Sequence, residues 1–236
     1  MIKSISVVIP FFNEEKRISK CLKHIIKYKK KIKTEFILVN DGSNDKSKLI
    51  VKNFQKNFEN IKLINLRKNN GKGYALKKGI ENCKNEWALT TDLDFSVPLN
   101  QFYFWIKKNY LKKNCNIYFG SRAHKKSRVK AKLIRFIFGI IFKSIISLLL
   151  KIKIKDTQCG YKLYKTNVAK KIFRNLKTNR FEHDIEIALY ANKFNFYIIE
   201  LPVTWVHKKN SKINLFLDPI KMFFAILFLK YKWNFF

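Results

Sequence analysis

The chain has 236 residues, of which 47% are hydrophobic and 28% charged, and its formal net charge is +34. This length is enough for one domain with a proper core, and so strong a positive charge predicts anionic partners: nucleic acid, anionic lipid or phosphorylated small molecules. The four cysteines lie far apart without paired spacing, which excludes a disulfide framework or a zinc site and indicates a reduced, cytoplasm-facing protein.

The N-terminal residues run directly into an apolar segment and lack the features of a signal peptide. The β-branched residues at 5–10 predict a buried strand that ends at Pro10. Asn13 is expected to cap the helix that follows, with Glu14 and Glu15 in its first turn, where the helix dipole favours acids. Further apolar runs predict strands at residues 36–39, 61–66, 87–91 and 116–120, with helices between them.

This alternation of strands and helices predicts an α/β fold, in which helices cover both faces of a parallel sheet. No internal repeat or linker divides the sequence, so we expect a single domain over residues 1–236. Ligands of parallel sheets bind beyond the carboxyl ends of the strands, and polar clusters occur at four such ends. We therefore expect one site made by Asn13-Glu14, Asp41-Gly42-Ser43, Gly71-Lys72-Gly73 and the pair Asp92 and Asp94.

Asp92 and Asp94 are separated by one residue at the end of an apolar strand, and no Lys or Arg in the run 89–98 neutralises them. A divalent cation would do so, because Mg²⁺ binds carboxylate oxygens and keeps positions open for phosphates. The alternative is a solvated turn, which is the better interpretation of Asp-x-Asp standing alone. The other three clusters at the same sheet edge favour the cation site.

Two apolar segments, at residues 127–155 and 213–236, are predicted to form amphipathic helices at a membrane interface. Lys and Arg inside the first segment make a lone membrane-spanning helix costly. No acid occurs between residues 95 and 155, so this part of the chain is expected to be attracted to an anionic membrane surface. The alternative for the first segment is a pair of helices packed on the domain.

Residues 7–14 (Val-Val-Ile-Pro-Phe-Phe-Asn-Glu) resemble the first-strand motif of the inverting glycosyltransferases of family 2, and residues 39–43 (Val-Asn-Asp-Gly-Ser) resemble the second. The resemblance covers essentially the whole chain. It implies the GT-A fold, a Rossmann-like, mixed and mostly parallel sheet with helices on both faces. Within the family, the chain is similar to the dolichyl-phosphate β-glucosyltransferases and their bacterial polyprenyl-phosphate relatives at residues 91–98, 120–122, 156–162 and 184–186 and at Trp205.

Those enzymes move glucose from UDP-glucose to a polyprenyl phosphate at the cytoplasmic face of a membrane, and the resemblance implies the same reaction here. Asp94, with help from Asp92, is then expected to hold Mg²⁺ or Mn²⁺ against the diphosphate. Asp41 is expected to accept a hydrogen bond from the uracil ring, and Arg122 to lie near the diphosphate or the acceptor phosphate. The other residues expected to contact the nucleotide sugar are Pro10, Phe12, Asn13, Glu14, Ser43 and Lys72.

Asp184 and Glu186 stand where the family usually keeps its base. Because a phosphate acceptor is already ionised near pH 7, Asp184 is expected to orient groups rather than to remove a proton. A purely structural role is the alternative: Asp184 as a partner of the helix dipole, Arg122 as a solvated charge and Gly71-Lys72-Gly73 as a plain turn. His183 is expected to be a surface or packing residue, and Cys159 a small buried residue in a turn.

Two features depart from the family pattern. Phe12 stands where an aromatic residue with a hydroxyl is frequent, and the N-terminal membrane anchor of eukaryotic members is not expected. Three functional alternatives stay open: a GDP-mannose-dependent polyprenyl-phosphate mannosyltransferase, a family 2 transferase with another acceptor, and a basic nucleic-acid-binding protein. Ordered acids at strand ends disfavour the last, so no nucleic-acid partner is expected.

Overall fold

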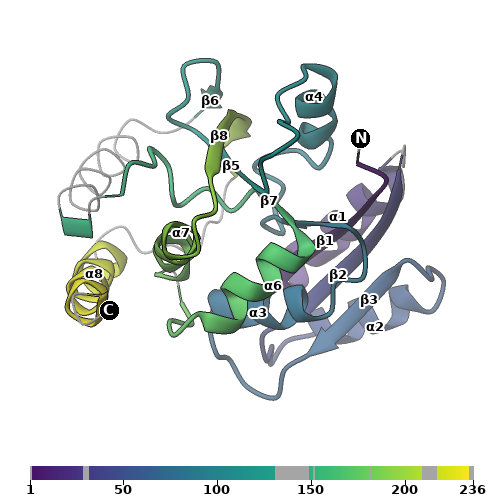
Figure 1. The fold of residues 1–236 in the computed structure, drawn as a ribbon. Helices are drawn as coiled ribbons and strands as arrows, with labels where there is room; N and C mark the ends of the chain where they lie inside the picture. Colours follow the sequence, from purple (N-terminus) through teal and green to yellow (C-terminus); the bar gives the residue numbers. More distant parts are fainter. Residues whose placement is uncertain are drawn as a thin grey trace.

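A computed structural model of the chain describes residues 2–28, 32–130, 149–150, 152–180, 182–208 and 217–233. They form a seven-stranded sheet in the order β3-β2-β1-β4-β7-β5-β8 and a two-stranded sheet of β6 and β9 (Figure 1). The strands are β1 Ser4–Phe11, β2 Lys33–Asn40, β3 Ile61–Asn65, β4 Trp87–Thr90, β5 Ile117–Ser121, β6 Arg128–Lys130, β7 Lys162–Lys165, β8 Ile198–Pro202 and β9 Thr204–Val206. The helices are α1 Glu15–Lys27, α2 Ser47–Gln55, α3 Lys72–Glu81, α4 Gln101–Lys107, α6 Thr166–Asn175, α7 His183–Lys193 and α8 Leu217–Trp233.

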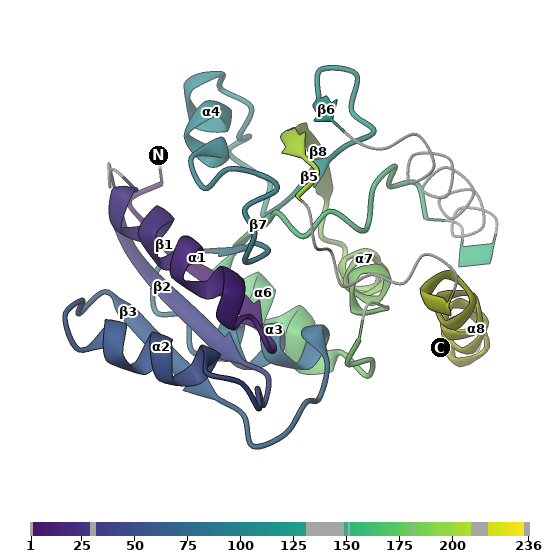
Figure 2. The same ribbon diagram turned by 180° about the vertical axis from the view of Figure 1, so that it is seen from behind.

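Helices cover both faces of the large sheet, as Figures 1 and 2 show from opposite sides. Successive side chains of a strand point to opposite faces, so a fully apolar strand must be buried on both. In β1, Val7 and Ile9 belong to the core under α1 and α4, whereas Val8 belongs to the core under α3 and α6. The prediction that the continuous apolar runs form strands of a sheet with both faces covered is therefore confirmed.

Strand β7 is antiparallel to both of its neighbours, β4 and β5, while the other pairs in the large sheet are parallel. An antiparallel strand starts at the edge where the parallel strands end. Lys162, the first residue of β7, accordingly pairs in register with Thr90 near the end of β4 and with Phe119 in β5. This reversal brings the loop at residues 156–161 to the same edge as the polar clusters after β1, β2 and β4.

The expected cap of the first helix is wrong by one residue. Glu14, and not Asn13, occupies the cap position before α1, and it makes no capping hydrogen bond with its side chain. Asn13 has a left-handed backbone with φ of 51°, which an N-cap residue does not adopt. Only Glu15 then remains as an acid in the first helical turn.

The two segments predicted to lie at a membrane interface are described only in part. Residues 131–148 and 151 of the first segment and 213–216 and 234–236 of the second lie outside the described residues. Arg128–Lys130 forms strand β6, paired with β9, rather than part of a helix. The second segment does contain a helix, α8. Among the residues that the structure describes, no helix is long and apolar enough to cross a membrane.

Candidate active site

A cleft of about 550 Å³ lies at the edge of the large sheet where β1, β2 and β4 end. Nine of the residues predicted to act in catalysis or donor binding line it together, although they are spread over most of the sequence. They are Pro10, Phe12, Glu14, Asp41, Lys72, Asp92, Asp94, Arg122 and Asp184. The expectation that the strand-end clusters meet in one place is thus confirmed by the fold.

Asn13 and Ser43 do not line this cleft but hold its wall together. The Ser43 hydroxyl accepts a hydrogen bond of 2.9 Å from the backbone N–H of Asn13. In the other direction, the Asn13 side chain accepts one of 2.9 Å from the backbone N–H of Asn44. These bonds fasten the loop after β1 to the loop after β2, so the two residues position the cleft wall from behind.

Asp92 is neutralised by a residue that lies far away in the sequence. Lys72, the first residue of α3, donates to its Oδ1 at 2.5 Å. Partial burial works to raise the pKa of Asp92, but the Lys72 charge outweighs it and the pKa lies below its ordinary value. No Lys or Arg within residues 89–98 neutralises Asp92, as the sequence indicated, but Lys72 from another strand–helix unit does.

Asp92 is also fixed from its other side. A Cβ atom on Gly160 would lie 2.5 Å from Asp92 Oδ2, so only glycine allows the loop before β7 to approach this carboxylate. Gly160 belongs to the stretch 156–162 whose resemblance to a family motif was noted in the sequence. Its physical role is to leave room for the Asp92 carboxylate.

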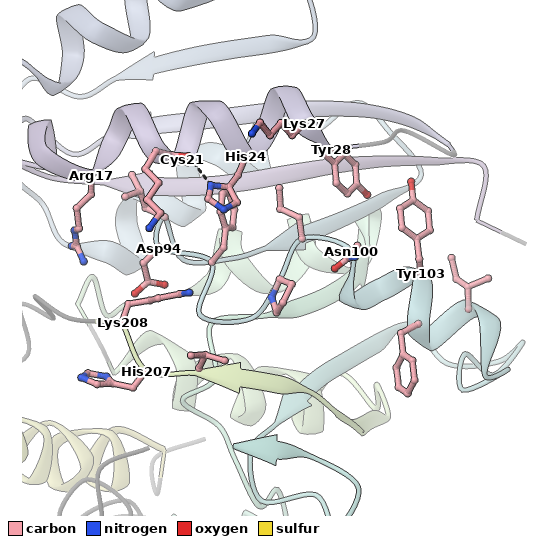
Figure 3. Close-up of a pocket in the computed structure, with 18 of the residues that line it drawn as sticks. Arg17, Cys21, His24, Lys27, Tyr28, Asp94, Asn100, Tyr103, His207 and Lys208 are labelled. Carbon is pink, nitrogen blue, oxygen red and sulfur yellow. Dashed lines mark hydrogen bonds between the residues drawn. The ribbon is translucent and has the colours of Figure 1, made fainter. Parts of the chain in front are cut away.

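The Asp94 carboxylate is more available to a ligand than the Asp92 carboxylate. Its Oδ1 accepts a hydrogen bond of 2.8 Å from the backbone N–H of Ser96, and among the described residues no hydrogen bond reaches its Oδ2. Figure 3 shows the Asp94 carboxylate facing open space between Arg17 and Lys208. Of the two acids, Asp94 is therefore better placed to bind a ligand.

This arrangement fits a Mg²⁺ or Mn²⁺ ion that shares its coordination with a substrate. The described part of the chain brings no three His, Cys, Asp or Glu side chains together, as a site made only of protein ligands would. Mg²⁺ is commonly bound through one or two carboxylates plus the phosphate oxygens of a substrate. Asp94, with Asp92 beside it in the cleft, supplies that number of carboxylates.

Asp41 organises the loop after β3. It accepts hydrogen bonds from the backbone N–H groups of Asn70 at 2.9 Å and Gly71 at 2.8 Å, and from the Asn69 side chain at 3.0 Å. Burial raises the pKa of Asp41 despite these bonds. A carboxylate accepts about four hydrogen bonds, so Asp41 can hold this loop and still accept one from a ligand.

Arg122 is held in place by Asp156. Its Nε and Nη2 donate to the two oxygens of Asp156 at 2.8 Å each, and its backbone N–H donates to the same carboxylate. The Trp205 ring lies 5.9 Å from the guanidinium carbon. Two of the five guanidinium N–H groups are used in this way, which leaves three on the same side chain for an anion in the cleft.

Asp184 lies at the start of α7 and forms a buried ion pair with Lys162. The imidazole of His183 is also enclosed: its Nδ1 donates to the Arg180 carbonyl at 2.5 Å, and its Nε2 lies 3.3 Å from Asp184 Oδ1. Burial alone would raise the pKa of Asp184, but the neighbouring His183, Lys162 and Lys72 lower it, so the carboxyl is ionised at neutral pH. His183 is thus a packing residue, as expected, and not a surface one.

Sequence reasoning gave no role to several residues at the cleft or directly behind it. Lys162 was part of a recognised motif without a role, although it is the buried partner of Asp184. Arg17 lies three residues after Glu14 and forms an ion pair with it, a spacing that could have been noticed. Other polar lining residues that were given no role are Asn69, Gln158, Arg180, His207 and Lys208, of which only Gln158 lies in a stretch noted in the sequence, residues 156–162.

Comparison with known proteins adds independent findings. The family profile described as "Glycosyl transferase family 2" matches residues 6–173. The dolichyl-phosphate beta-glucosyltransferase ALG5A of Trichomonas vaginalis is 35% identical, over 89% of this chain and 68% of the relative. The dolichyl-phosphate beta-glucosyltransferase of Dictyostelium discoideum is 33% identical, over 97% of this chain and 74% of the relative.

Among solved structures, the glucosyl-3-phosphoglycerate synthase of Mycobacterium tuberculosis in complex with Mn²⁺, UDP and glucosyl-3-phosphoglycerate has a similar fold. Its TM-score is 0.65 with 14% identity, over 97% of this chain and 80% of that chain. At this level of identity the likeness establishes the fold, a GT-A-like mixed and mostly parallel sheet with helices on both faces.

Proposed function

This chain belongs to glycosyltransferase family 2 and is a glycosyltransferase. We propose that it transfers glucose from UDP-glucose to a polyprenyl phosphate with inversion. The observation that carries the proposal is one cleft lined both by Asp92 and Asp94, which suit a cation–diphosphate group, and by Arg122, which suits a second phosphate. A reaction between a nucleotide diphosphate sugar and a phosphate acceptor needs both features. The names of the relatives, dolichyl-phosphate beta-glucosyltransferases, support glucose and a lipid phosphate as the pair of substrates.

For the donor, we assign the uracil and ribose to the wall made by Pro10, Phe12, Glu14 and Asp41. Asp41 is the group that accepts from the base, and Asn13 and Ser43 hold the wall in shape. Lys72 stands beside Asp92, where its ammonium is also available to the diphosphate. When bound at Asp94 and Asp92, Mg²⁺ or Mn²⁺ supplies Lewis-acid stabilisation of the charge that develops on the departing UDP.

For the acceptor, we assign the phosphate to the guanidinium of Arg122, which Asp156 orients. An oxygen of this phosphate attacks C1 of the sugar as the bond from C1 to the UDP oxygen breaks, and the electron pair leaves with UDP. A phosphate monoester has its second pKa near 6, so its oxygen needs no base near pH 7. Asp184 then acts by orienting the sugar or its neighbours.

We also propose that the protein works at the cytoplasmic face of a membrane, where a polyprenyl phosphate is anchored. Helix α8 supports this, because Ile226 and Leu229 are buried against the domain while the opposite apolar side chains are 38–67% exposed. A helix with such an exposed face suits the membrane interface. All four cysteines are free and buried, as suits a reducing compartment. The exposed side chains are Phe223, Phe224, Leu227, Phe228 and Tyr231.

A transfer assay tests the reaction directly. Purified protein, radiolabelled UDP-glucose, Mn²⁺ and polyprenyl phosphate in anionic vesicles should yield a chloroform-soluble product that mild acid hydrolyses. If GDP-mannose labels the lipid and UDP-glucose does not, the donor assignment is wrong. Labelling of a different acceptor, with none of the lipid phosphate, would support the other open alternative of a family 2 transferase with another acceptor.

Membrane binding is tested separately by flotation with the same vesicles. Phe224→Asp on α8 should reduce the bound fraction, whereas Leu49→Asp on α2, which is also exposed, should not. Equal flotation of the parent protein, Phe224→Asp and Leu49→Asp would show that α8 is not part of the surface that docks on the membrane.

A further inference from the structure

A second and larger concavity, which we call the α1–α4 groove, continues from the cleft along one side of α1 (Figure 3). Its volume is about 1350 Å³, and it lies between α1, α4 and the residues that follow β4. Asp94, Arg17 and Lys208 line both the groove and the cleft, so the two are continuous at that end. At the other end the rings of Tyr28 and Tyr103 stack with centroids 5.8 Å apart.

The walls of the groove are mostly apolar. They include Leu93, Phe95 and Leu99 from the loop after β4, and Phe104 and Ile106 from α4. Along α1 the groove runs from Arg17 to Tyr28, which at 1.5 Å per helical residue is about 16 Å. An apolar channel of this length suits several units of a hydrocarbon chain.

The charges of the groove are distributed unevenly. Its basic lining residues are Arg17, Lys20, Lys27, Lys107 and Lys208, and Asp94 is the single acid among the described residues that line it. Lys20, Lys27 and Lys107 are exposed. Such a rim favours an anionic headgroup or an anionic membrane surface next to an apolar floor. The complementary ligand is an amphiphile with one negative end and a long apolar chain.

We propose that the α1–α4 groove binds the first isoprene units of the polyprenyl phosphate acceptor. The chain enters the groove at the Asp94 and Arg17 end, and the phosphate lies in the adjoining cleft, at Arg122. This inference rests on the proposed function and adds to it the path of the lipid chain. The acceptor must bring its phosphate to the cleft while its chain stays out of water, and the groove begins where the cleft ends. The chain then leaves the groove past the exposed lysines.

Photo-crosslinking tests the path of the chain. A polyprenyl phosphate with a diazirine on its second isoprene unit is irradiated with the full-length protein, in the presence of UDP and Mn²⁺, and the labelled peptides are identified by mass spectrometry. We expect labels within residues 18–28 and 98–107. Labels confined to α8 or to residues outside the groove would overturn the inference.

Substitution at the groove supplies a second, quantitative readout. Phe104 is 42% exposed on α4, so Phe104→Asp puts a charge into the groove with little risk to folding. We expect this variant to raise the KM for the polyprenyl phosphate by about tenfold, with the KM for UDP-glucose unchanged. The control Leu49→Asp, at an even more exposed position on α2, should change neither value. An unchanged acceptor KM in Phe104→Asp would also contradict the groove.

These experiments separate the two proposals. If the unsubstituted protein transfers glucose to the lipid but the labels lie elsewhere, the groove assignment fails and the proposed function stands. If it transfers none but the groove peptides are labelled, the lipid site stands and the reaction must be reassigned. If neither transfer nor labelling occurs, both are wrong.

Discussion

Lys162 and Asp184 form an ion pair that is almost completely enclosed, with 1% and 5% of their side chains exposed. Lys162 is the first residue of the antiparallel strand β7, and Asp184 lies in the first turn of α7. The pair therefore joins the large sheet to a helix at the cleft. A buried charge that loses its partner is costly, whereas an apolar pair of similar size is tolerated.

We expect Lys162→Met to lower the free energy of unfolding by about 3–5 kcal/mol, because it removes the lysine ammonium that pairs with the buried Asp184 carboxylate. The double variant Lys162→Met/Asp184→Leu should regain most of that stability. Urea denaturation of the three proteins measures both effects. A stable single variant would contradict the importance of the pair, and a stable double variant that still transfers sugar would make Asp184 a purely structural residue.

Asp94→Asn should separate metal binding from folding. The asparagine side-chain oxygen can still accept the hydrogen bond from Ser96, so the free energy of unfolding should stay within about 1 kcal/mol. The transfer rate should fall at least about 100-fold, because a negative ligand to the cation is lost. Binding of Mn²⁺ in the presence of UDP, followed by electron paramagnetic resonance, should weaken in parallel. Glu81→Gln, at an exposed acid on α3, is the control and should behave like the parent.

Gly160→Ala tests the close approach of the loop before β7 to Asp92. The added methyl group would meet Asp92 Oδ2 at 2.5 Å, so the carboxylate or the loop must move. We expect a folded protein with a rate reduced by at least about tenfold, since shifts of about 1 Å at a reacting site are costly. Cys159→Ala, next to it, is the matched control. Burial raises the pKa of the Cys159 thiol to about 12, so no reactive thiolate is lost and activity should remain.

His183 should make the protein sensitive to mild acid. Burial lowers its pKa to about 4, against the opposing effect of Asp184. Since the unfolded value is near 6.5, the unfolded chain binds more protons between these values, and the free energy of unfolding should fall by roughly 3 kcal/mol as the pH decreases from 7 to 4. Chemical denaturation across this range measures the fall. His183→Asn should remove most of it, whereas His24→Asn, at an exposed position on α1, should keep it.

The central strands and the edge they share could be predicted because the information is local. Each apolar run ends in its own polar cluster, and parallel strands bring those ends together. The partners of the acids could not be predicted in the same way. Lys72 reaches Asp92, and Lys162 reaches Asp184, only because α3 and β7 take particular places in the sheet. A lysine in a short strand segment carries no sign that its ammonium is buried.

The α1–α4 groove could not be predicted for a related reason. Cys21 fits the apolar face of a helix, Tyr28 follows the end of that helix, and Phe104 and Ile106 fit a second helix that is far away in the sequence. Only the packing of the sheet and the loop after β4 decides that these faces leave a space between them. Their apolar pattern therefore indicated a core and gave no sign of a cavity.

The reversed direction of β7 also sets the order in which the strands of the large sheet can pair during synthesis on the ribosome. The strands β1 to β4 form a parallel unit that ends at Thr90, and this unit, with the loop that follows it, already holds Asp41, Lys72, Asp92 and Asp94. The outer edge of β4, however, stays unpaired until Lys162–Lys165 has been synthesised and turns back to cover it. During that interval the nascent chain carries an open strand edge, which another chain can pair with and which therefore promotes aggregation.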